Sequence, residues 1–251
     1  MSFNYFLWHN PRFQFWVICI VFILSSLTAH AQIASGKITY ERRTNLYKKF
    51  KWNKDVKEWL KEEDKNKIDF FELYFNDSLS LFKPQESELV DRMSWATAKN
   101  TVYQNNKTKV RITYKKIWGE SLLVQDSLRK FSWKITEGKR NIAGYVCRKA
   151  IWQASDSVKI YAWFCNELNP SIGPESIVGL PGAILGVATE DGGVVYFAKS
   201  VELTKQEPTI LLPKKMKQKI YQTNELKTQL EKEYGKEKWG KAMIYNNFEI
   251  W

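Results

Sequence analysis

The stretch Gly173-Pro174-Glu175-Ser176-Ile177-Val178-Gly179-Leu180-Pro181-Gly182-Ala183-Ile184-Leu185-Gly186 places two prolines and four glycines within fourteen residues. Proline fixes φ and removes an N–H donor, and Leu180, which precedes a proline, is driven to an extended conformation. Pro181 and Gly182 suit the two central positions of a type II turn, because the second position needs a positive φ. The sequence therefore predicts a rigid corner that leads into a strand.

This predicted corner has two interpretations. Leu180 packs into the core as a structural corner, since loop prolines and glycines usually serve turn chemistry. Alternatively, the corner presents Leu180 and Ile177 to a partner or ligand. Gly186, inside the strand expected at 183–189, indicates a bulge or the close approach of a neighbour. The residues expected to shape the corner are Gly173, Pro174, Gly179, Leu180, Pro181, Gly182 and Ile184.

Most of the remaining sequence is typical of strands joined by short polar turns. Apolar residues alternate with polar ones, and turn signals such as Asp191-Gly192-Gly193 separate the alternating segments. Short turns between successive strands favour antiparallel pairing over βαβ units. We therefore expect a mainly β fold, a curved antiparallel sheet shaped as a bowl or half-barrel. The expected strands are 36–43, 69–75, 79–81, 101–103, 110–114, 130–136, 142–152, 158–165, 183–189 and 194–201.

Two segments break the strand pattern. Residues 55–65 are charged and carry three apolar residues at helical spacing, which predicts a short inserted helix on the surface. Residues 224–238 carry apolar residues four apart on a Lys/Glu background, with Thr223 or Asn224 as the expected N-cap. We expect a C-terminal helical segment from about 223 that packs on a sheet face, because its apolar stripe is too narrow for a membrane-surface helix.

The first 31 residues have the features of a signal peptide. Arg12 is the only charged residue among them, an apolar run follows at 13–27, and Ala29-His30-Ala31 is a small-x-small cleavage signature. We expect cleavage after Ala31, leaving 32–251 as a single mature domain. The alternative is a retained anchor, but the run is shorter than the roughly 20 residues of a spanning helix. We expect export to the periplasm, the outer membrane or the exterior, with no membrane span after cleavage.

Loss of the leader removes both histidines, His9 and His30. A chain without imidazole forms no Ser-His-Asp or Cys-His site and no histidine-ligated zinc site. We therefore expect no enzyme, no cofactor and no metal site. The net charge of +12, which loss of Arg12 lowers by one, indicates a solvated lysine-rich surface or affinity for anionic envelope lipid or polysaccharide. Nucleic acid is not an expected partner, since the sequence has no recognition motif for it.

Two cysteines remain in the mature chain, Cys147 and Cys165. If 142–152 and 158–165 form a hairpin centred on Asp156, the two cysteines face each other. Opposed residues of a non-hydrogen-bonded pair come close enough for a disulfide. We expect one disulfide in an oxidising compartment, and the alternative is two buried thiols on one face.

The same hairpin places Lys149 opposite Trp163. The lysine then forms a cation–π contact or covers the aromatic ring with its aliphatic stem. These two residues join Ile177 and Leu180 as candidate partner-binding residues.

Four blocks of sequence, in order between about 130 and 200, resemble the GLPGLI family of secreted or envelope proteins of Bacteroidota. Residues 179–184 are similar to the hexapeptide that names the family, with Ala183 where the name has leucine. The other three blocks resemble its Gly-Tyr-x-Cys-x-Lys-Ala strand, its Ala-Trp-aromatic strand and its Ser-x-Gly-Pro segment, and they are Gly144-Tyr145-Val146-Cys147-Arg148-Lys149-Ala150, Ala162-Trp163-Phe164 and Ser171-Ile172-Gly173-Pro174. The resemblance implies the same architecture over about 36–202 and supplies no catalytic residue.

Three functions are compatible with these observations. We expect a non-enzymatic, exported cell-envelope protein that binds or assists an envelope protein, a glycan or a lipid. The alternative is a periplasmic carrier or chaperone for a hydrophobic ligand or an outer-membrane protein, which requires an open apolar cavity. A less favoured alternative is a hydrolase with paired carboxylates, for which the candidates near the corner are Glu167, Glu175, Glu190 and Asp191.

Overall fold

The computed structural model describes residues 35–51, 53–86, 91–117, 120–156, 158–204, 210 and 219–248. The chain divides into two compact units, Met1–Gln32 and Ile33–Trp251, and every described residue belongs to the second unit. The expected leader at 1–31 and its cleavage point lie outside the described residues. Over the described ranges, the structure contains no helix with the length and apolar character to cross a membrane.

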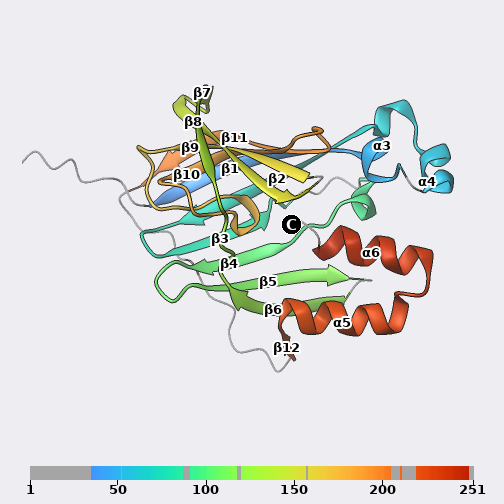
Figure 1. Ribbon diagram of the computed structural model, residues 1–251. Coiled ribbons are helices and arrows are strands. Elements are labelled where there is room, and N and C mark those ends of the chain that lie inside the picture. Colours follow the sequence, from blue (N-terminus) through green and yellow to red (C-terminus); the bar gives the residue numbers. More distant parts are fainter. Residues whose placement is uncertain are drawn as a thin grey trace, which may run out of the picture. The chain divides into compact units, whose positions relative to one another are not determined.

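The second unit is built on one 12-stranded sheet (Figure 1). The strands run in the order β12-β6-β5-β4-β3-β2-β1-β11-β10-β9-β8-β7. The pairs are antiparallel except that of β12 with β6, which is parallel. The strands are β1 Gly36–Asn45, β2 Asn66–Phe75, β3 Leu79–Pro84, β4 Thr101–Asn105, β5 Val110–Ile117, β6 Glu120–Ser127, β7 Lys134–Ile142, β8 Tyr145–Ser155, β9 Val158–Cys165, β10 Ala183–Thr189, β11 Val194–Leu203 and β12 Ile220–Tyr221.

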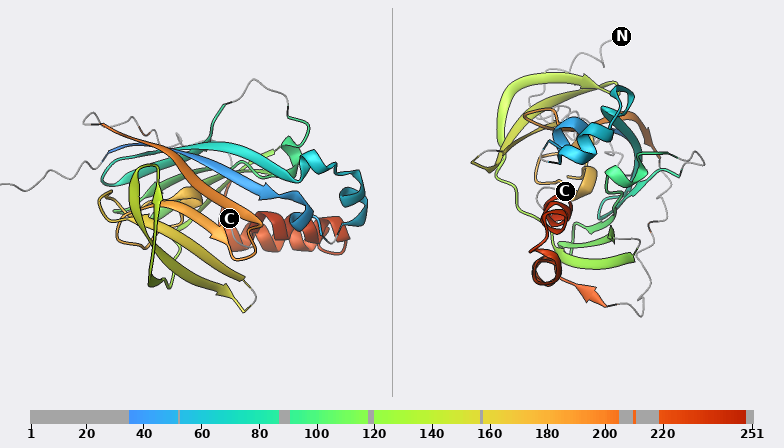
Figure 2. Two further views of the ribbon diagram at one scale, coloured as in Figure 1. Left: turned by 90° about the horizontal axis from the view of Figure 1, so that it is seen from above. Right: turned by 90° about the vertical axis from the view of Figure 1, so that its right-hand side faces the viewer.

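The sheet is open and curved, and its strands surround an interior (Figure 2). This confirms the predicted mainly β class with a curved antiparallel sheet. The short parallel edge strand β12 and the strand β6 are two elements that the sequence pattern did not predict. Both lie on the side of the sheet where the C-terminal helices pack.

The predicted polar turns join successive strands, and their side chains satisfy the turn backbone. The Asn76 Oδ1 accepts hydrogen bonds from the backbone N–H groups of Ser78 and Leu79, at 3.0 and 2.8 Å. The Asp191 Oδ1 accepts from the Gly193 N–H at 2.8 Å, and Gly192 has a φ of 67°. Short side chains that accept from the backbone two or three residues ahead are what makes such sequences turn.

Short helices lie between β1 and β2, where one inserted helix at 55–65 was expected. They are α3 Leu46–Lys49, α4 Lys54–Trp59 and the 3-10 helix η1 Glu62–Asp64. The side chains of Asn45 and Asn53 cap α3 and α4 by accepting from the N–H groups of Lys48 and Val56. Two further 3-10 helices, η2 Ser94–Ala96 and η3 Pro174–Ser176, lie in the connections before β4 and before β10.

The C-terminal segment is a pair of helices, α5 Thr223–Tyr234 and α6 Lys238–Phe248, where a single helix was expected. The expected N-cap at Thr223 or Asn224 is wrong, because the N-cap is Gln222, without a side-chain cap bond. The carboxylate of Asp126 in β6 accepts from the Thr223 N–H at 3.0 Å and from its Oγ1 at 2.6 Å. A strand residue therefore supplies the cap that local sequence lacks.

The C-terminal helices pack on β5 and β6, as a one-stripe helix was expected to do. Their buried apolar side chains form a cluster with two residues of the sheet, and the members are Ile117, Val124, Leu226, Leu230, Ile244 and Phe248. A larger core joins β1, β2 and β3 to β8, β9 and β10. This division leaves the middle of the interior to the polar side chains of the candidate site.

The predicted corner packs against the core. Leu180 is 2% exposed and Ile177 is 5% exposed, so neither side chain is presented to a partner. Gly182 has the predicted positive φ, 134°, but the type II turn is wrong. The Leu180 carbonyl accepts from the Gly182 N–H at 2.8 Å and closes a three-residue turn, while the Ala183 N–H donates to the Leu168 carbonyl.

The strand expected at 130–136 is wrong in its first four residues, since β7 begins at Lys134. Phe131 and Trp133 lie before it and stack on each other, with ring centroids 5.7 Å apart. The Trp133 Nε1–H donates to the Val178 carbonyl at 2.8 Å, and its ring lies against Gly179. These aromatic residues therefore pack against the corner. The alternation pattern had instead predicted that they belong to a strand.

The predicted disulfide is not formed. The predicted register is present, because Lys149 pairs with Trp163 and Arg148 with Phe164, which carries Cys147 towards Cys165. Both cysteines are free and buried, and burial raises the pKa of the Cys147 thiol to about 12. The Cys147 thiol donates to the Tyr145 carbonyl at 3.6 Å. Two buried thiols, the alternative interpretation, fill this part of the core.

Candidate functional site

The interior of the sheet changes from apolar to polar along β1 and β2. On β1 the alternate buried residues run Ile38, Tyr40, Arg42 and Thr44. Their partners on β2 run Leu73, Phe71, Asp69 and Lys67, which are also buried. The same alternation that builds the core therefore carries four polar side chains into the interior, and each of them needs a partner there.

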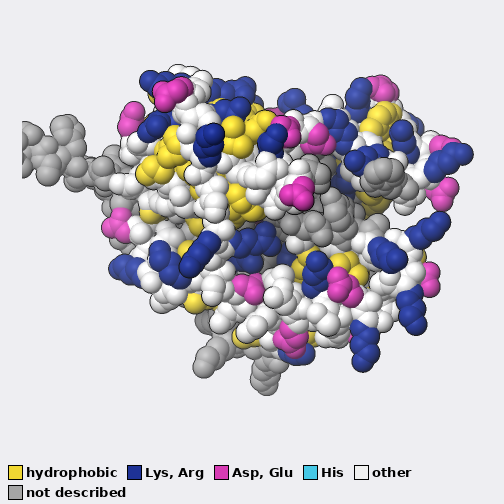
Figure 3. Space-filling model, in the orientation of Figure 1, with side chains coloured by type: hydrophobic (Ala, Val, Ile, Leu, Met, Phe, Trp, Pro, Cys, Tyr) yellow, Lys and Arg dark blue, Asp and Glu magenta, His cyan; other side chains and the backbone are white. Residues whose placement is uncertain are grey.

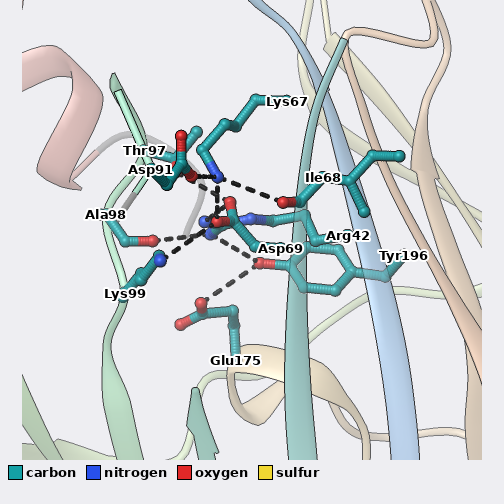
Figure 4. A network of polar contacts seen from close by, with 10 residues as sticks. All are labelled: Arg42, Lys67, Ile68, Asp69, Asp91, Thr97, Ala98, Lys99, Glu175 and Tyr196. Atoms are coloured by element: carbon teal, nitrogen blue, oxygen red, sulfur yellow. Dashed lines mark hydrogen bonds and ion pairs between the residues drawn. The ribbon is translucent and has the colours of Figure 1, made fainter. Parts of the chain in front are cut away.

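Asp69 is the centre of this polar network (Figure 4). Its Oδ2 accepts from the Arg42 guanidinium at 2.7 Å and from the Thr97 hydroxyl at 2.8 Å. Its Oδ1 accepts from the Lys67 ammonium at 2.7 Å and lies 3.4 Å from the Lys99 ammonium. Burial alone would raise the pKa of Asp69, but Arg42 and Lys67 together hold that pKa far below its usual range. Asp69 is therefore a fixed buried anion.

Arg42 connects the apolar core to the network. Its guanidinium carbon lies 4.7 Å from the centroid of the Phe71 ring, and its Nη1 donates to the Ala98 carbonyl at 2.7 Å. The same Nη1 lies 3.4 Å from the Tyr196 hydroxyl. Arg42 thus remains protonated and is stacked on one side and hydrogen-bonded on the other.

Glu175 reaches this network from the Gly/Pro-rich corner at 173–186. Glu175 and Ser176 in η3 both have positive φ, 52° and 64°, a conformation that costs about 1–2 kcal/mol for residues with a Cβ. The Tyr196 hydroxyl donates to Glu175 Oε1 at 3.2 Å, and the Asn100 amide donates to Oε2 at 3.3 Å. The Ser176 hydroxyl donates to Gln104 at 2.9 Å. The strained turn therefore directs polar side chains across the interior towards β4.

Two hollows flank Glu175 and Asn100, which line both. The first is lined by Asn100, Val102, Arg111, Thr113, Lys115, Arg129, Glu175, Thr223, Asn247 and Phe248. The second is lined by Arg42, Thr44, Lys49, Thr97, Ala98, Asn100, Glu175, Val194 and Tyr196. The first has room for a single water-sized group, and the second is larger. Figure 3 shows Lys and Arg side chains gathered in a depression at the centre of one face of the molecule.

Each hollow contains a lysine with a lowered pKa. Burial, followed by the charge of Arg42, lowers the pKa of Lys49 to about 8. Burial lowers the pKa of Lys115 to about 8 as well, and there Arg111 and Arg129 add to the effect while Glu175 opposes it. Among the described residues, Glu175 is the one carboxylate on the lining of both hollows, against Arg42 and Lys49 in the second and Arg111, Lys115 and Arg129 in the first, so cationic side chains outnumber anionic ones on both linings.

Of the four carboxylates proposed for a hydrolase, only Glu175 lies in the interior. Glu167, Glu190 and Asp191 are exposed. Glu190 accepts from Lys159 and Tyr161, and Asp191 accepts from the Gly193 N–H in the β10–β11 turn. The four residues therefore do not come together as a carboxylate pair in one cleft.

Lys149 and Trp163 face each other across β8 and β9, as predicted. The lysine ammonium lies over the Tyr161 ring, 4.1 Å from its centroid. Arg140 lies over Trp163 at 5.7 Å and over Phe197 at 4.5 Å. Arg140 is exposed and the other four residues are half-buried, and together they form a cation–aromatic surface that is separate from the polar network. The cation–π contact predicted for Trp163 is therefore made by Arg140.

The sequence analysis missed most of this site. Arg42 and Asp69 were detectable, because each continues the alternation of apolar core residues on its strand. Arg111, Thr113 and Lys115 on β5 gave no such signal, since the apolar residues that alternate with them, Val110, Ile112 and Tyr114, are only half-buried. The described residues contain no cluster of three or more His, Cys, Asp or Glu suited to a metal ion.

Comparisons with known proteins bear on the fold. No family model matches the chain, and no curated protein matches it. Among solved structures, PNGF-II in space group C2 has a TM-score of 0.51 at 20% identity, over 84% of this chain and 33% of that chain. PNGF-II in space group P21 gives 0.48 and 20%, over 75% and 31%. An uncharacterised conserved protein from Thermus thermophilus gives 0.38 and 8%, over 81% and 99%.

The likeness to PNGF-II in space group C2 shows a shared fold. This chain spans about one third of the length of that protein. At 20% identity the likeness concerns the fold alone, so the function is argued from the polar network and its hollows.

Proposed function

We propose that this protein is a non-enzymatic, exported cell-envelope protein that binds its partner or ligand through the polar network inside the curved sheet. The partner is an envelope protein, a glycan or a lipid that places a polar group in the hollows beside Glu175. Export rests on the leader at 1–31, and the resemblance to the GLPGLI family accords with an envelope location.

One observation carries this proposal: polar side chains from distant parts of the chain are buried around two small hollows. Burial of charged groups is costly, and a structural core of this size needs none of them. The corner also holds Glu175 and Ser176 at strained positive φ, and such strain clusters at binding sites. A fold that retains these costs is well suited to recognising a polar group.

The network favours binding over catalysis because its central carboxylate stays ionised. Asp69 is bound by two cations and a hydroxyl, so it neither donates nor accepts a proton near neutral pH. Burial lowers the pKa values of Lys49 and Lys115 to about 8, so both ammonium groups are mostly protonated at neutral pH and can attract a negative group.

The same hollows favour a polar ligand over a hydrophobic cargo. The apolar core is filled by packed side chains, and the lining of both hollows consists mostly of polar residues. A carrier of lipid or of unfolded outer-membrane protein needs an apolar cavity, so the carrier or chaperone role is the second candidate.

The test places a photo-crosslinking amino acid at Lys49, on the lining of the second hollow, in the protein expressed in cells of its native type. A matched variant carries the same group at Lys232, an exposed residue on α5. We expect a discrete crosslinked product from position 49 and none from position 232. Equal products from both positions, or none from position 49, would contradict the proposal. N-terminal sequencing of the envelope fraction should begin at Gln32.

A further inference from the structure

We propose that the hollow bounded by β5, η3 and the C-terminal helices is a binding site for an oxyanion, namely the carboxylate or phosphate group of the ligand. The cations that define this anion site are Arg111, Lys115 and Arg129. The inference rests on the proposed binding function and names the chemical class of group that enters the hollow.

The three cations of the anion site converge from two segments. Arg111 and Lys115 are four residues apart on β5, so both side chains lie on the same face of the strand, and both are buried. Arg129 follows β6 and lines the same hollow. Burial, followed by the charge of Arg111, lowers the pKa of Arg129. The cations therefore repel one another, and an anion between them relieves that repulsion.

Arg111 has an unused donor at the site. Its Nη2 binds the Asp126 carboxylate at 3.2 Å, while its buried Nε–H has no hydrogen-bond partner among the described residues. A buried donor without an acceptor costs about 1–3 kcal/mol. A guanidinium presents its donors in a fork that matches the oxygens of a carboxylate or phosphate. A ligand oxyanion would satisfy this donor.

Lys115 is held in place by the end of a helix. Its ammonium donates to the Asn247 carbonyl at 2.7 Å and lies 5.2 Å from the centroid of the Phe248 ring. Asn247 belongs to the last turn of α6, where carbonyls have no partner within the helix and carry the negative end of its dipole. The ammonium is therefore already bonded to a carbonyl oxygen with a partial negative charge. A full anion would replace this oxygen or bind the ammonium beside it.

The fold binds one carboxylate of its own beside the hollow. Asp126 accepts from Arg111 and from the N–H and hydroxyl of Thr223, the first residue of α5. These contacts hold the pKa of Asp126 below its usual range, against the opposing effect of burial. An arginine and a helix N-terminus are the usual components of an anion site, and here they are shown to hold a carboxylate.

Charge accounting gives the interior an excess of positive charge. The cations of the polar network and the anion site are Arg42, Lys49, Lys67, Lys99, Arg111, Lys115 and Arg129. Among the described residues, the anions that face them are Asp69, Asp91, Asp126 and Glu175. At the anion site Arg111, Lys115 and Arg129 face Asp126 and Glu175, which leaves one positive charge in excess there. The rest of the excess lies around Asp69 and Asp91.

The size of the hollow limits what enters. Its free space is about that of one water molecule, so one oxygen of a terminal carboxylate or phosphate enters without movement of the walls, and the rest of the group lies at the mouth of the hollow. Asn247 and Phe248 form one wall, so a larger headgroup would have to displace the last turn of α6.

The test measures binding of acetate, inorganic phosphate and glucuronate by calorimetry at low ionic strength, with the protein purified from the exported fraction. We expect saturable binding of acetate or phosphate that chloride does not reproduce. The variant Arg129→Gln should weaken this binding about tenfold or more, since a hydrogen bond to a charged group contributes about 1.5–3 kcal/mol. Glucuronate that binds more tightly than acetate would assign the oxyanion to a sugar acid.

The matched control is Lys116→Gln, which removes one positive charge from the exposed neighbour of Lys115 on the same strand. It should leave the affinity unchanged. Lys115→Gln gives a second test should Arg129→Gln fail to fold, as judged by circular dichroism. Absence of binding, or equal weakening by Lys116→Gln and Arg129→Gln, would overturn the inference. Crosslinking from position 49 without any oxyanion binding would retain the proposed function and reject this ligand class.

Discussion

The two ends of the β1–β2 ladder have the same backbone geometry and opposite chemistry. At one end Ile38 and Leu73 face each other in the apolar core, and at the other Arg42 faces Asp69. All four side chains are buried. Apolar side chains stabilise the fold in proportion to the area that they bury, and they tolerate substitution by residues of similar volume. Each buried charge instead needs a partner of opposite charge within a few ångströms. The apolar end therefore holds the fold together, and the polar end is where we propose that recognition takes place.

The largest effect should come from the corner, which anchors the apolar end. Gly182→Val should cost at least about 5 kcal/mol of folding free energy or prevent folding. A Cβ at position 182 would lie 1.9 Å from the Cys165 carbonyl oxygen, and φ is 134°. Thermal unfolding followed by circular dichroism measures the change.

The matched control for that variant is Gly192→Ala. Gly192 also has a positive φ, 67°, but a Cβ there would meet no atom within 4 Å. The cost should be about 1 kcal/mol, from backbone conformation alone. Similar losses in both variants would show that the close contact with Cys165 is not the cause.

The next largest effect should come from the polar end. Asp69→Asn should destabilise the fold by about 3–5 kcal/mol, because it leaves Arg42 buried without its anion and Lys67 with Asp91 alone. Urea unfolding measures the loss. Asp77→Asn, at an exposed turn position, should change the stability by no more than about 0.5 kcal/mol.

The lowered pKa of Asp69 also predicts how the stability of the protein falls in acid. Its pKa is lowered in the folded protein, so the stabilisation is fully present above the unfolded value of about 4. It is lost as the pH falls through the lower folded value. Asp69→Asn should flatten this acid limb, and an acid limb of unchanged slope would contradict the role given to Asp69.

A smaller effect is expected at the anion site, where removing a charge should stabilise the protein and not destabilise it. The folded pKa of Lys115, about 8, lies below its ordinary value, so the folded state binds fewer protons than the unfolded state between about pH 8 and 10.4. Stability should therefore rise with pH across this window. Lys115→Met should remove that rise and stabilise the protein near neutral pH by about 1–3 kcal/mol. A rise that persists in the variant would assign it to another group, such as Lys49.

Reduction should have the smallest effect. Cys147 and Cys165 are free thiols in the core, so the melting temperature should be the same with and without a reductant. Mass spectrometry after alkylation should find both thiols modified once the protein is unfolded. A melting temperature several degrees lower under reduction would show that a disulfide forms, since bridges contribute about 2–4 kcal/mol.

Much of the fold was predictable because it is encoded locally. The alternation on β1 and β2, the Asx turns and the register of Lys149 with Trp163 follow from short stretches of sequence. Other features depend on distant residues. The cap of α5 comes from Asp126, and Trp133 leaves the expected strand because its indole binds the Val178 carbonyl.

The candidate site was less predictable for the same reason. The sequence places Glu175 near the corner, but its partners Tyr196 and Asn100 lie on β11 and just before β4. On β5 Arg111 and Lys115 face inward, opposite to what apolar alternation indicates. Only the curvature of the sheet, which no single strand encodes, brings these side chains to one place.

The tight packing around the corner limits which residues related proteins can carry there. A Cβ on Gly186 would lie 2.6 Å from the Phe197 ring, and one on Gly182 would strike the backbone. Both positions therefore favour glycine because a larger side chain would clash there, whether or not the protein binds a ligand. Lineages that inherit this corner are therefore expected to keep these two positions whatever ligand they bind.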